Sequence, residues 1–583
     1  MSKSLIQSLL ITSLCASLAA CGGGGGGSSE SAPIGTASAS VAPANDTSTP
    51  TTTASSQDNV DELAFTSDPN APVGTVDPAI DLPFDPELNP IPNDPNEVAE
   101  DGTAISLATS AGGTMRAAAL SGAACEGLPA MPSVPSGARS VREFGAIPND
   151  NIDDTAAIQR ALNSLQPGQW LRFPAGRYIH NKSLWMHVPG SVMWSDGATL
   201  HATNKTDQGI MLAADGASIY GFTLTAVSDV RRTTPWESRI AIFDDVRNTA
   251  PTRNNVIRRN KILAGTPGTS TANGASAAGI YVYFAENFLI AENEIHRTLS
   301  DGMHITRASA YGRVLNNKIR ETGDDMIGMV SLLGDNWTKT SAQVEVNSFS
   351  ERARRNVVHD IVVAGNDLAG QYWGRGISVV GGRGITIRDN KINRPTQAAA
   401  IYLAREPGYM TFGVHNIVVK NNYISEVQTT NPVYSVKGIP AKSNQAGIEM
   451  YANIFDDESR YSLLRSELRV ARVHVENNTV DRTKNNGLRT GVTAGKRNKI
   501  VGRTSEGAYI ERWYTGVNVG PVNLANNKFT NIGSAPAMRL MNSITGNPAT
   551  YCSNNLMSGL LTGSSLCNTS STTAVTGARL TCG

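Results

Sequence analysis

A short phrase recurs along this chain, in which a β-branched strand is followed by an asparagine and one more apolar residue. It reads LIAENEI, VLNNKI, IVVAGNDL, ITIRDNKI and IVVKNNYI, with its asparagines at Asn293, Asn317, Asn366, Asn390 and Asn422. These asparagines are 24, 49, 24 and 32 residues apart. A unit of about 24 residues holds three short strands and their turns, which is one coil of a parallel β-helix. The repeat therefore predicts an all-β solenoid, a right-handed parallel β-helix.

The repeated asparagine suits the bends of such a coil. Asparagine tolerates the left-handed backbone conformation of a tight bend, and asparagines stacked in successive coils can pass side-chain hydrogen bonds along a solenoid. We therefore expect these residues to be structural.

The segment before the repeats predicts a helical cap. Asp153, Asp154 and Thr155 offer an N-cap for the helical phrase AAIQRALNSL, and WLRFPAGRYI then supplies a first strand and turn. A solenoid needs such a cap, because its end would otherwise expose apolar core and unpaired strand edges.

The first 20 residues have the form of an export signal, with a basic start, a short apolar run and small residues at the end. The phrase LAAC resembles the lipobox of bacterial lipoproteins, which implies cleavage before Cys21 and acylation of its thiol. Gly22 follows where an inner-membrane retention signal has Asp. The resemblance thus implies a lipoprotein of the Gram-negative outer membrane, on its periplasmic face or the cell surface. The alternative is an ordinary secretory signal.

Residues 21–124 are rich in Gly, Ser, Thr, Pro and acids and predict a disordered tether that precedes a folded domain over 125–583. The whole chain has 50 basic and 50 acidic residues, yet no Lys or Arg lies between Lys3 and Arg116. The folded part is therefore net positive. In an exported protein, such a charge favours a polyanionic glycan over nucleic acid as partner, although it can also serve solubility alone.

Four cysteines follow the lipidation site, at Cys125, Cys552, Cys567 and Cys582. An even number in an oxidising compartment predicts two disulfides. We favour Cys552 with Cys567 as a local loop in a C-terminal cap, and Cys125 with Cys582 between the two ends of the fold. Metal binding is the weaker alternative, because no Cys-x-x-Cys spacing occurs.

Three acids are expected to meet on one face of the coils. Asp301 and Asp325 lie 24 residues apart, each two residues before an apolar residue expected to point inward, and Asp324 is adjacent. Residues one coil apart stack roughly 4.8 Å from each other. Like charges this close raise at least one pKa, as a general acid requires. This arrangement suits cleavage of a glycosidic bond; the alternative is that the acids merely cap turns.

Basic and aromatic residues extend this line. Residues 331–358 form a polar insertion, so Arg375 follows Asp325 by about one coil and Arg405 follows one coil later. We expect substrate-binding side chains from this region, because sugar rings stack on aromatic faces and basic groups bind anions. These are Arg375, Arg405, His304, Tyr372, Trp373 and Tyr402.

The segment from Val141 to Ile179 resembles the N-terminal signature of the pectate-lyase-3 type in the pectin-lyase-like superfamily. The later motifs resemble the active site of family 28 glycoside hydrolases, the polygalacturonases. Their Asn-Thr-Asp, Gly-Asp-Asp, Gly-His-Gly and Arg-Ile-Lys motifs correspond here to LSD, GDD, GRG and ARE. The resemblance implies Asp324 as general acid, Asp301 and Asp325 as activators of water, and Arg405 as the ligand of a substrate carboxylate.

Two departures leave other activities open. Arg375 replaces the family's His, and Glu406 replaces its Lys. One alternative is a uronate lyase or epimerase, in which Asp301, Asp324 and Asp325 hold Ca²⁺ and a basic side chain takes the C5 proton. Another is a glycan-binding surface lipoprotein without activity. The hydrolase interpretation, which needs no cofactor, is preferred, with an acidic polysaccharide as substrate and a monomeric enzyme that contacts the membrane only through its lipid.

Overall fold

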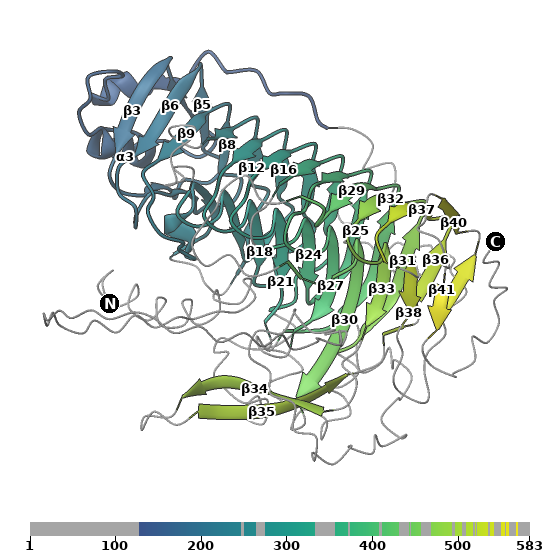
Figure 1. Cartoon of the computed structure of the whole chain (residues 1–583). Coiled ribbons are helices and arrows are strands. Elements are labelled where there is room, and N and C mark those ends of the chain that lie inside the picture. Colours follow the sequence, from purple (N-terminus) through teal and green to yellow (C-terminus); the bar gives the residue numbers. More distant parts are fainter. Residues whose placement is uncertain are drawn as a thin grey trace, which may run out of the picture.

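The computed structural model describes residues 128–569, except for 246–249, 264–274, 333–355, 371–373, 407–410, 431–441, 444, 456–467, 492–495, 504–508, 517–518, 521, 535–536, 541–549, 554 and 559–566. The described part is an elongated stack of coils that runs from the capped N-terminal end to the C-terminal strands (Figure 1). The predicted signal, the tether, Cys21, Cys125 and Cys582 lie outside the described residues. Among the residues that are described, no helix has the length and apolar character to cross a membrane.

Three long parallel sheets form the walls of the coils in the described part. Sheet 1 contains, in spatial order, β1 (Arg139–Ser140), β2 (Trp170–Phe173), β5 (Val192–Ser195), β8 (Ser218–Tyr220), β12 (Val256–Arg258), β16 (Leu289–Ala291), β19 (Arg313–Leu315), β22 (Val362–Ala364), β25 (Gly382–Arg388), β28 (Val414–Lys420), β31 (Val470–Glu476), β36 (Val522–Ala525) and β39 (Thr550–Ser553). Sheet 2 contains β4 (Leu184–Met186), β7 (Ile210–Leu212), β10 (Ile240–Ile242), β14 (Ile280–Tyr283), β18 (Met303–Thr306), β21 (Ile327–Val330), β24 (Ile377–Val380), β27 (Ile401–Arg405), β30 (Ile448–Phe455), β33 (Leu488–Gly491), β38 (Met538–Leu540) and β41 (Cys567–Thr569).

Sheet 3 contains β3 (Gly176–His180), β6 (Ala198–Ala202), β9 (Thr223–Ala226), β13 (Lys261–Ile262), β17 (Glu294–His296), β20 (Lys318–Arg320), β23 (Asp367–Ala369), β26 (Lys391–Asn393), β29 (Tyr423–Val427), β32 (Thr479–Thr483), β37 (Lys528–Ile532) and β40 (Leu556–Ser558). The short strands β11 (Thr252–Arg253) and β15 (Ala285–Glu286) pair with each other. Strands β34 (Lys496–Arg503) and β35 (Tyr509–Gly516) form an antiparallel hairpin that joins β30 and projects from the stack (Figure 1).

Within sheets 1, 2 and 3, each strand pairs in parallel with the equivalent strand of the next coil, which confirms the predicted right-handed parallel β-helix. The 24-residue interval appears directly as register, since Ile290 of β16 pairs with Val314 of β19. Inward-facing aliphatic side chains from all three sheets form one continuous buried core. The predicted insertion at 331–358 lies between β21 and β22, and most of it falls outside the described residues.

The N-terminal end of the core is covered by α3 (Thr155–Asn163), next to the 3₁₀ helix η4 (Val141–Phe144). Ala157, Ile158, Ala161 and Leu162 form the buried side of α3, as expected for a cap. The expected N-cap is confirmed in part: Oδ1 of Asp153 accepts a hydrogen bond from the backbone N–H of Thr155 at 3.0 Å, whereas Asp154 makes no side-chain cap bond. Its carboxylate instead accepts hydrogen bonds from backbone nitrogens elsewhere in the cap.

The repeated asparagines form a continuous ladder inside the coils, which confirms the predicted hydrogen-bonded stack. Nδ2 of Asn293 donates to Oδ1 of Asn317 at 3.0 Å, and the next coils repeat this contact. The left-handed bend, however, lies one residue earlier than we expected. Glu292 and Asn316 have φ values of 56° and 54°, whereas the ladder asparagines are not among the residues with positive φ.

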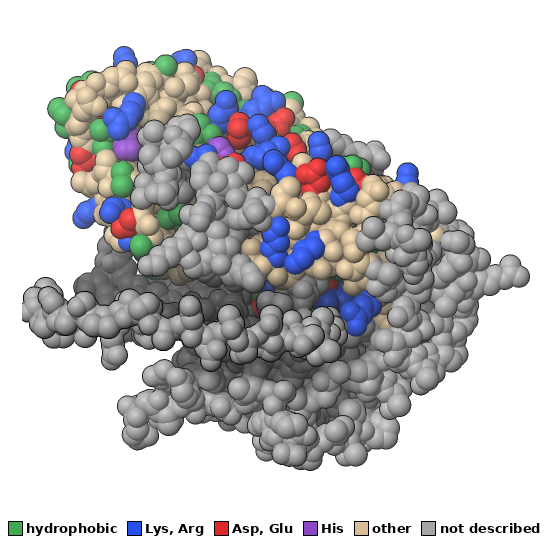
Figure 2. Space-filling view, viewed as in Figure 1, with side chains coloured by type: hydrophobic (Ala, Val, Ile, Leu, Met, Phe, Trp, Pro, Cys, Tyr) green, Lys and Arg blue, Asp and Glu red, His purple; other side chains and the backbone are tan. Residues whose placement is uncertain are grey.

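Charged side chains on the outside also pair from coil to coil. Lys318 lies 3.3 Å from Glu294, and Arg258 and Arg259 both contact Glu292. Accordingly, Lys and Arg side chains alternate with Asp and Glu side chains on part of the described face in view (Figure 2). Such exposed pairs contribute little stability individually.

Candidate active site

The predicted stacking of Asp301 and Asp325 is present. Both acids lie in the turns just before β18 and β21, and Met303 pairs with Ile327 two residues later. The backbone N–H of Gly302 donates to the carbonyl of Asp325 at 2.9 Å. The acids are therefore neighbours on consecutive coils, at the N-terminal ends of two adjacent strands of sheet 2.

Asp301 and Asp324 each engage one carboxyl oxygen and leave the other unpaired. Oδ2 of Asp301 lies 2.6 Å from Nδ1 of His304, and Oδ2 of Asp324 accepts a hydrogen bond from the guanidinium of Arg231. Both acids are buried, yet Oδ1 of each has no hydrogen-bond partner within the described chain. Buried polar atoms in native proteins are normally satisfied, so these oxygens are positions where a water or ligand group is expected.

Asp325 is held more firmly. One of its oxygens accepts a hydrogen bond from the backbone N–H of Arg375 at 2.5 Å, and the other accepts one from the hydroxyl of Ser378. Both donors belong to the next coil. Asp325 therefore ties two coils together beneath the other two acids.

The burial of these carboxyl groups changes their protonation. Burial raises the pKa of Asp324 to about 7, with the guanidinium of Arg231 acting in the opposite direction and Asp301 adding to the rise. Burial and the charge of Asp324 raise the pKa of Asp325 well above its ordinary value. The cluster can therefore hold at least one proton near neutral pH, as a general acid must.

One glycine makes space for Asp324 and Asp325. A Cβ on Gly374 would lie 2.2 Å from Oδ1 of Asp324 and 2.3 Å from Oδ1 of Asp325. A Cβ on Gly328, by contrast, would lie 3.4 Å from Oδ2 of Asp301, which is an ordinary van der Waals contact. The first glycine of the GRG motif, Gly374, is thus required, because any side chain there would collide with the carboxyl groups of Asp324 and Asp325.

The two departures from the family 28 motifs contact each other. Nη2 of Arg375 donates to Oε1 of Glu406 at 3.1 Å, and the guanidinium carbon lies 4.3 Å from the ring centroid of Tyr402. Both residues differ from the motif at the positions of its His and Lys. Together they form an ion pair in which Arg375 lies on the face of Tyr402.

Arg405 does not join this cluster. It lies at the far end of β27 and shares the inward side of that strand with Ile401 and Leu403. It is fully buried, and its guanidinium donates to the backbone carbonyls of Thr411 and Asn453 at 3.1 and 2.7 Å. The predicted contact with a substrate carboxylate would require an exposed guanidinium, and that of Arg405 is buried.

The remaining predicted site residues are divided. His304 is buried and stacks on Tyr281 with ring centroids 4.9 Å apart, and Tyr402 lies beneath Arg375. Tyr372 and Trp373 lie outside the described residues. Cys552 and Cys567 belong to β39 and β41 of different sheets, and their side chains are outside the described part. Their pairing stays a prediction.

Residues 138–453, more than half of the chain, match the family described as rhamnogalacturonase A/epimerase, pectate lyase-like. The chain belongs to this family. All three acids, His304, Arg375 and Arg405 lie within the matched segment. No curated protein matches the chain in sequence.

Solved structures resemble the fold at low identity. The A-module of mannuronan C-5 epimerase AlgE4 from Azotobacter vinelandii is 13% identical, with a TM-score of 0.43 over 74% of this chain and 100% of that one. The catalytic unit of a thermostable GH87 α-1,3-glucanase from Streptomyces thermodiastaticus is 15% identical, with a TM-score of 0.45 over 73% and 70%. Similarity at this level carries no information about activity.

Membership of the rhamnogalacturonase A/epimerase family supports a carbohydrate-active enzyme of the parallel β-helix type. It agrees with the predicted polysaccharide-acting class. The description of this family names both hydrolytic and epimerising enzymes. The reaction therefore depends on the side chains of the site.

Sequence analysis missed Arg231, which reaches Asp324 from 93 residues earlier in the chain. Arg231 lies in the loop between β9 and η5 (Pro235–Glu237). This loop interrupts the repeat, so no interval or register relates it to the acids. Its two adjacent arginines, Arg231 and Arg232, close to Asp229 are the only signal that the loop offers.

A second missed feature is a row of outward side chains along sheet 2. Strand pairing aligns Trp185, Met211, Ala241, Tyr281 and His304 on successive coils. Aromatic side chains cluster at the N-terminal end of this row, where Trp185, Trp236 and Tyr283 are half-buried against Phe243. Strand pairing therefore connects this aromatic group to the acid cluster through buried side chains, since Met211, Ala241 and Tyr281 are at most 1% exposed.

In the described ranges, no three His, Cys, Asp or Glu side chains are arranged to hold a metal ion. Asp301, Asp324 and Asp325 are adjacent, but their oxygens are directed to His304, to Arg231 and to donors of the next coil. Among the oxygens of these acids, only Oδ1 of Asp301 and Oδ1 of Asp324 are without a hydrogen-bond partner within the described chain, and two carboxylate oxygens are fewer than the roughly six to eight oxygen ligands that Ca²⁺ takes.

Proposed function

We propose that the protein is a glycoside hydrolase that cleaves an acidic, uronate-containing polysaccharide at the cluster of Asp301, Asp324 and Asp325. The observation that carries this proposal is the buried Asp324 carboxyl, with a pKa of about 7 and one unpaired oxygen. A carboxylic acid with these properties can protonate the oxygen of a leaving sugar near neutral pH.

Asp301 is the partner that activates water in this proposal. Its contact with His304 at 2.6 Å orients the carboxyl group and can stabilise its negative charge, while Oδ1 stays unpaired. Asp325, held by Ser378 and the backbone of Arg375, supports the two reacting acids. Trp185, which is half-buried at the N-terminal end of the row along sheet 2, offers a face on which a sugar ring can stack.

The test is a screen of the purified protein against a panel of acidic polysaccharides, with and without a chelator. Hydrolysis releases reducing ends without new ultraviolet absorbance, and this activity should be lost in Asp324→Asn. Products that absorb in the ultraviolet, or activity that requires Ca²⁺, would refute the hydrolase. Binding without any product would instead indicate a glycan-binding protein.

One observation favours lyase or epimerase chemistry as a second candidate. The contact between Nδ1 of His304 and Asp301 leaves Nε2 of the imidazole available as a base. A base beside carboxyl groups can remove the C5 proton of a uronate. The same screen separates the outcomes, because a lyase forms unsaturated products and an epimerase changes sugar configuration without cleavage.

We also propose that the enzyme is an outer-membrane lipoprotein anchored through Cys21. The lipobox-like LAAC phrase supports this proposal. Radiolabelled palmitate should be incorporated into the native protein and not into a Cys21→Ser variant.

A further inference from the structure

Arg231 joins a surface loop to a fully buried acid. Its side chain is 26% exposed, whereas that of Asp324 is 0% exposed. The Arg231 side chain therefore contacts both solvent and the carboxyl group that the proposed function assigns as general acid. An anionic group of a bound polysaccharide can reach its exposed part.

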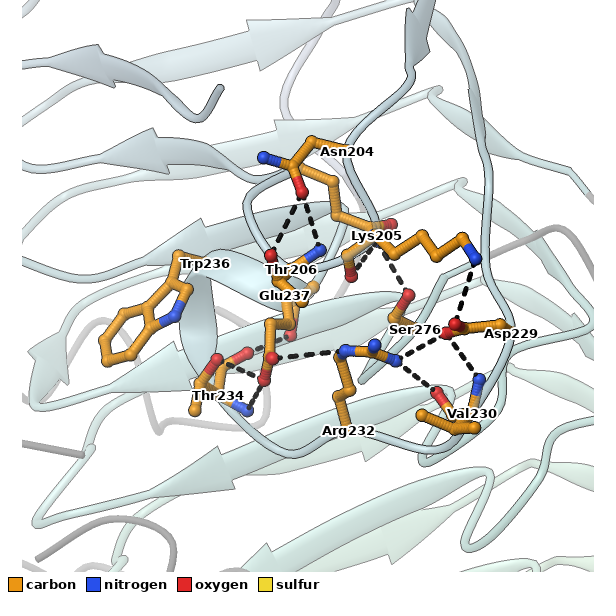
Figure 3. A network of polar contacts seen from close by, with 12 residues as sticks. Asn204, Lys205, Thr206, Asp229, Val230, Arg232, Thr234, Trp236, Glu237 and Ser276 are labelled. Atoms are coloured by element: carbon orange, nitrogen blue, oxygen red, sulfur yellow. Dashed lines mark hydrogen bonds and ion pairs between the residues drawn. The ribbon is translucent and has the colours of Figure 1, made fainter. Parts of the chain in front are cut away.

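The loop that carries Arg231 is anchored on both sides of it. Arg232 contacts Asp229 at 2.7 Å and Glu237 at 3.4 Å, and Lys205 contacts Asp229 at 3.0 Å. Figure 3 shows the Arg232 side chain between the carboxylates of Asp229 and Glu237.

The loop is also fixed through its backbone and its helical end. The backbone N–H of Arg232 donates to the carbonyl of Ser276 at 2.8 Å. Thr234 and Glu237 form a capping box at the start of η5. These contacts hold the backbone in place, so Arg231 can change partner by a side-chain movement alone.

The charges around Asp324 create a conflict in the free enzyme. Arg231 and Arg375 favour its charged form, whereas Asp301 and Asp325 are acids beside it. A general acid must hold a proton. With Arg231 in contact, the pKa of Asp324 is about 7, so only part of the molecules hold this proton near neutral pH, and the contact with Arg231 lowers that fraction. The conflict is resolved if the substrate itself supplies another anion for the guanidinium.

We propose that Arg231 is a latch on Asp324 that the substrate opens: a carboxylate of the polysaccharide takes the guanidinium, and Asp324 then takes up a proton from solvent. This inference rests on the proposed function. Arg231 stays protonated throughout and exchanges one carboxylate for another, so its charge is never left unpaired. Asp324 is left buried and neutral, which is the favourable state of a buried carboxyl group. The latch selects polymers with a uronate near the cleavage point.

The test compares the pH dependence of kcat/KM and of kcat on the acidic polymer that the wild type cleaves. The kcat/KM profile reports the free enzyme and the kcat profile reports the enzyme–substrate complex. In Arg231→Gln, the alkaline limb of kcat/KM should move upward by about one pH unit, because a nearby opposite charge is removed. The alkaline limb of kcat should not move, because the substrate has already removed Arg231 in the wild type. KM should rise by roughly tenfold.

Two variants control for general effects. Arg172→Gln removes a surface pair with Asp196 and should leave both profiles unchanged. Arg231→Lys keeps the positive charge but not the two-pronged geometry, so it should keep the wild-type kcat/KM limb with a raised KM. If Arg231→Gln fails to fold, Arg231→Lys still tests the proposal. An equal shift of both limbs in Arg231→Gln, or no rise of KM in Arg231→Lys, would overturn it.

A second substrate tests the carboxylate directly. On the same polymer with its carboxyl groups reduced to alcohols, nothing opens the latch, so Arg231→Gln should be faster than the wild type above pH 7. A slower or equal rate contradicts the latch. Failure of the wild type to cleave any polymer would instead refute the proposed function.

Discussion

At the scale of residues, the two departures from the polygalacturonase motifs, Arg375 and Glu406, have to be considered together. Taken separately, each replaces a residue that the polygalacturonase motifs require. In the structure they are partners 3.1 Å apart, and Arg375 also covers the ring of Tyr402. The two departures from the motif are therefore one interaction in this structure, and their effects on activity should depend on each other.

This coupling can be measured with a double-mutant cycle. Arg375→His leaves Glu406 without its cation, and Glu406→Lys places a second positive charge beside Arg375. The double variant restores the family 28 pattern and should lose less activity than the two single losses combined, with a coupling free energy of about 1–3 kcal/mol in kcat/KM. Strictly additive losses would show that the pair is incidental.

Asp324→Asn should lower kcat by about a hundredfold or more, because a lost general acid contributes roughly 10² to 10⁴ in rate. The same substitution should lower activity but raise the stability of the fold. The pKa of Asp324 rises from 3.8 to about 7 on folding, so the folded wild type loses stability as the pH rises through this window. Above pH 7 the variant should therefore melt at a higher temperature than the wild type. A lower melting temperature would indicate that the carboxylate stabilises the fold.

At the scale of elements, the ladder of buried asparagines connects successive coils, although the loops of these coils differ in length. Asn390 donates to Oδ1 of Asn422 and to the carbonyl of Val363, and it accepts from Asn366. Every rung is buried. The ladder therefore sets the position of one bend in each coil independently of the loops between strands.

Removal of one rung should be costly. Asn390→Ala leaves buried donors and acceptors of neighbouring rungs unpaired, and each such group costs about 1–3 kcal/mol. We expect the free energy of unfolding in urea to fall by roughly 2–4 kcal/mol. Lys391→Ala, at the exposed next position, is the matched control and should change it by less than about 0.5 kcal/mol. Equal effects of both variants would contradict a structural ladder.

At the scale of the whole molecule, the repeat interval was sufficient to predict the fold and the stacking of Asp301 on Asp325, because register follows from coil length. Position along a strand was harder to predict. Arg405 was placed on the line of acids by counting coils, yet it shares the inward side of its strand with Ile401 and Leu403. Arg231 was missed because a loop between coils has no period to count.

The position of Trp185 predicts how the length of the substrate affects its binding. Four strand spacings separate Trp185 from His304 along sheet 2, which is about 19 Å at roughly 4.8 Å each. Trp185→Ala should raise KM for long polymers severalfold and leave KM for disaccharides unchanged. Trp194→Ala, a half-buried tryptophan on sheet 1, should affect neither. An equal rise of KM for short and long substrates would contradict a role for Trp185 in binding distant sugars.

The N-terminal cap has a consequence for how copies of this chain can associate. The side-chain amide of Gln159 donates to the carbonyl of Trp185 at 3.0 Å and accepts from its N–H at 2.9 Å. It thereby occupies the groups that β4 would otherwise offer to another strand. Without α3, the first coil would present open strand edges with which a strand of another copy could pair. The same helix that closes the core thus also limits self-association at this end of the stack.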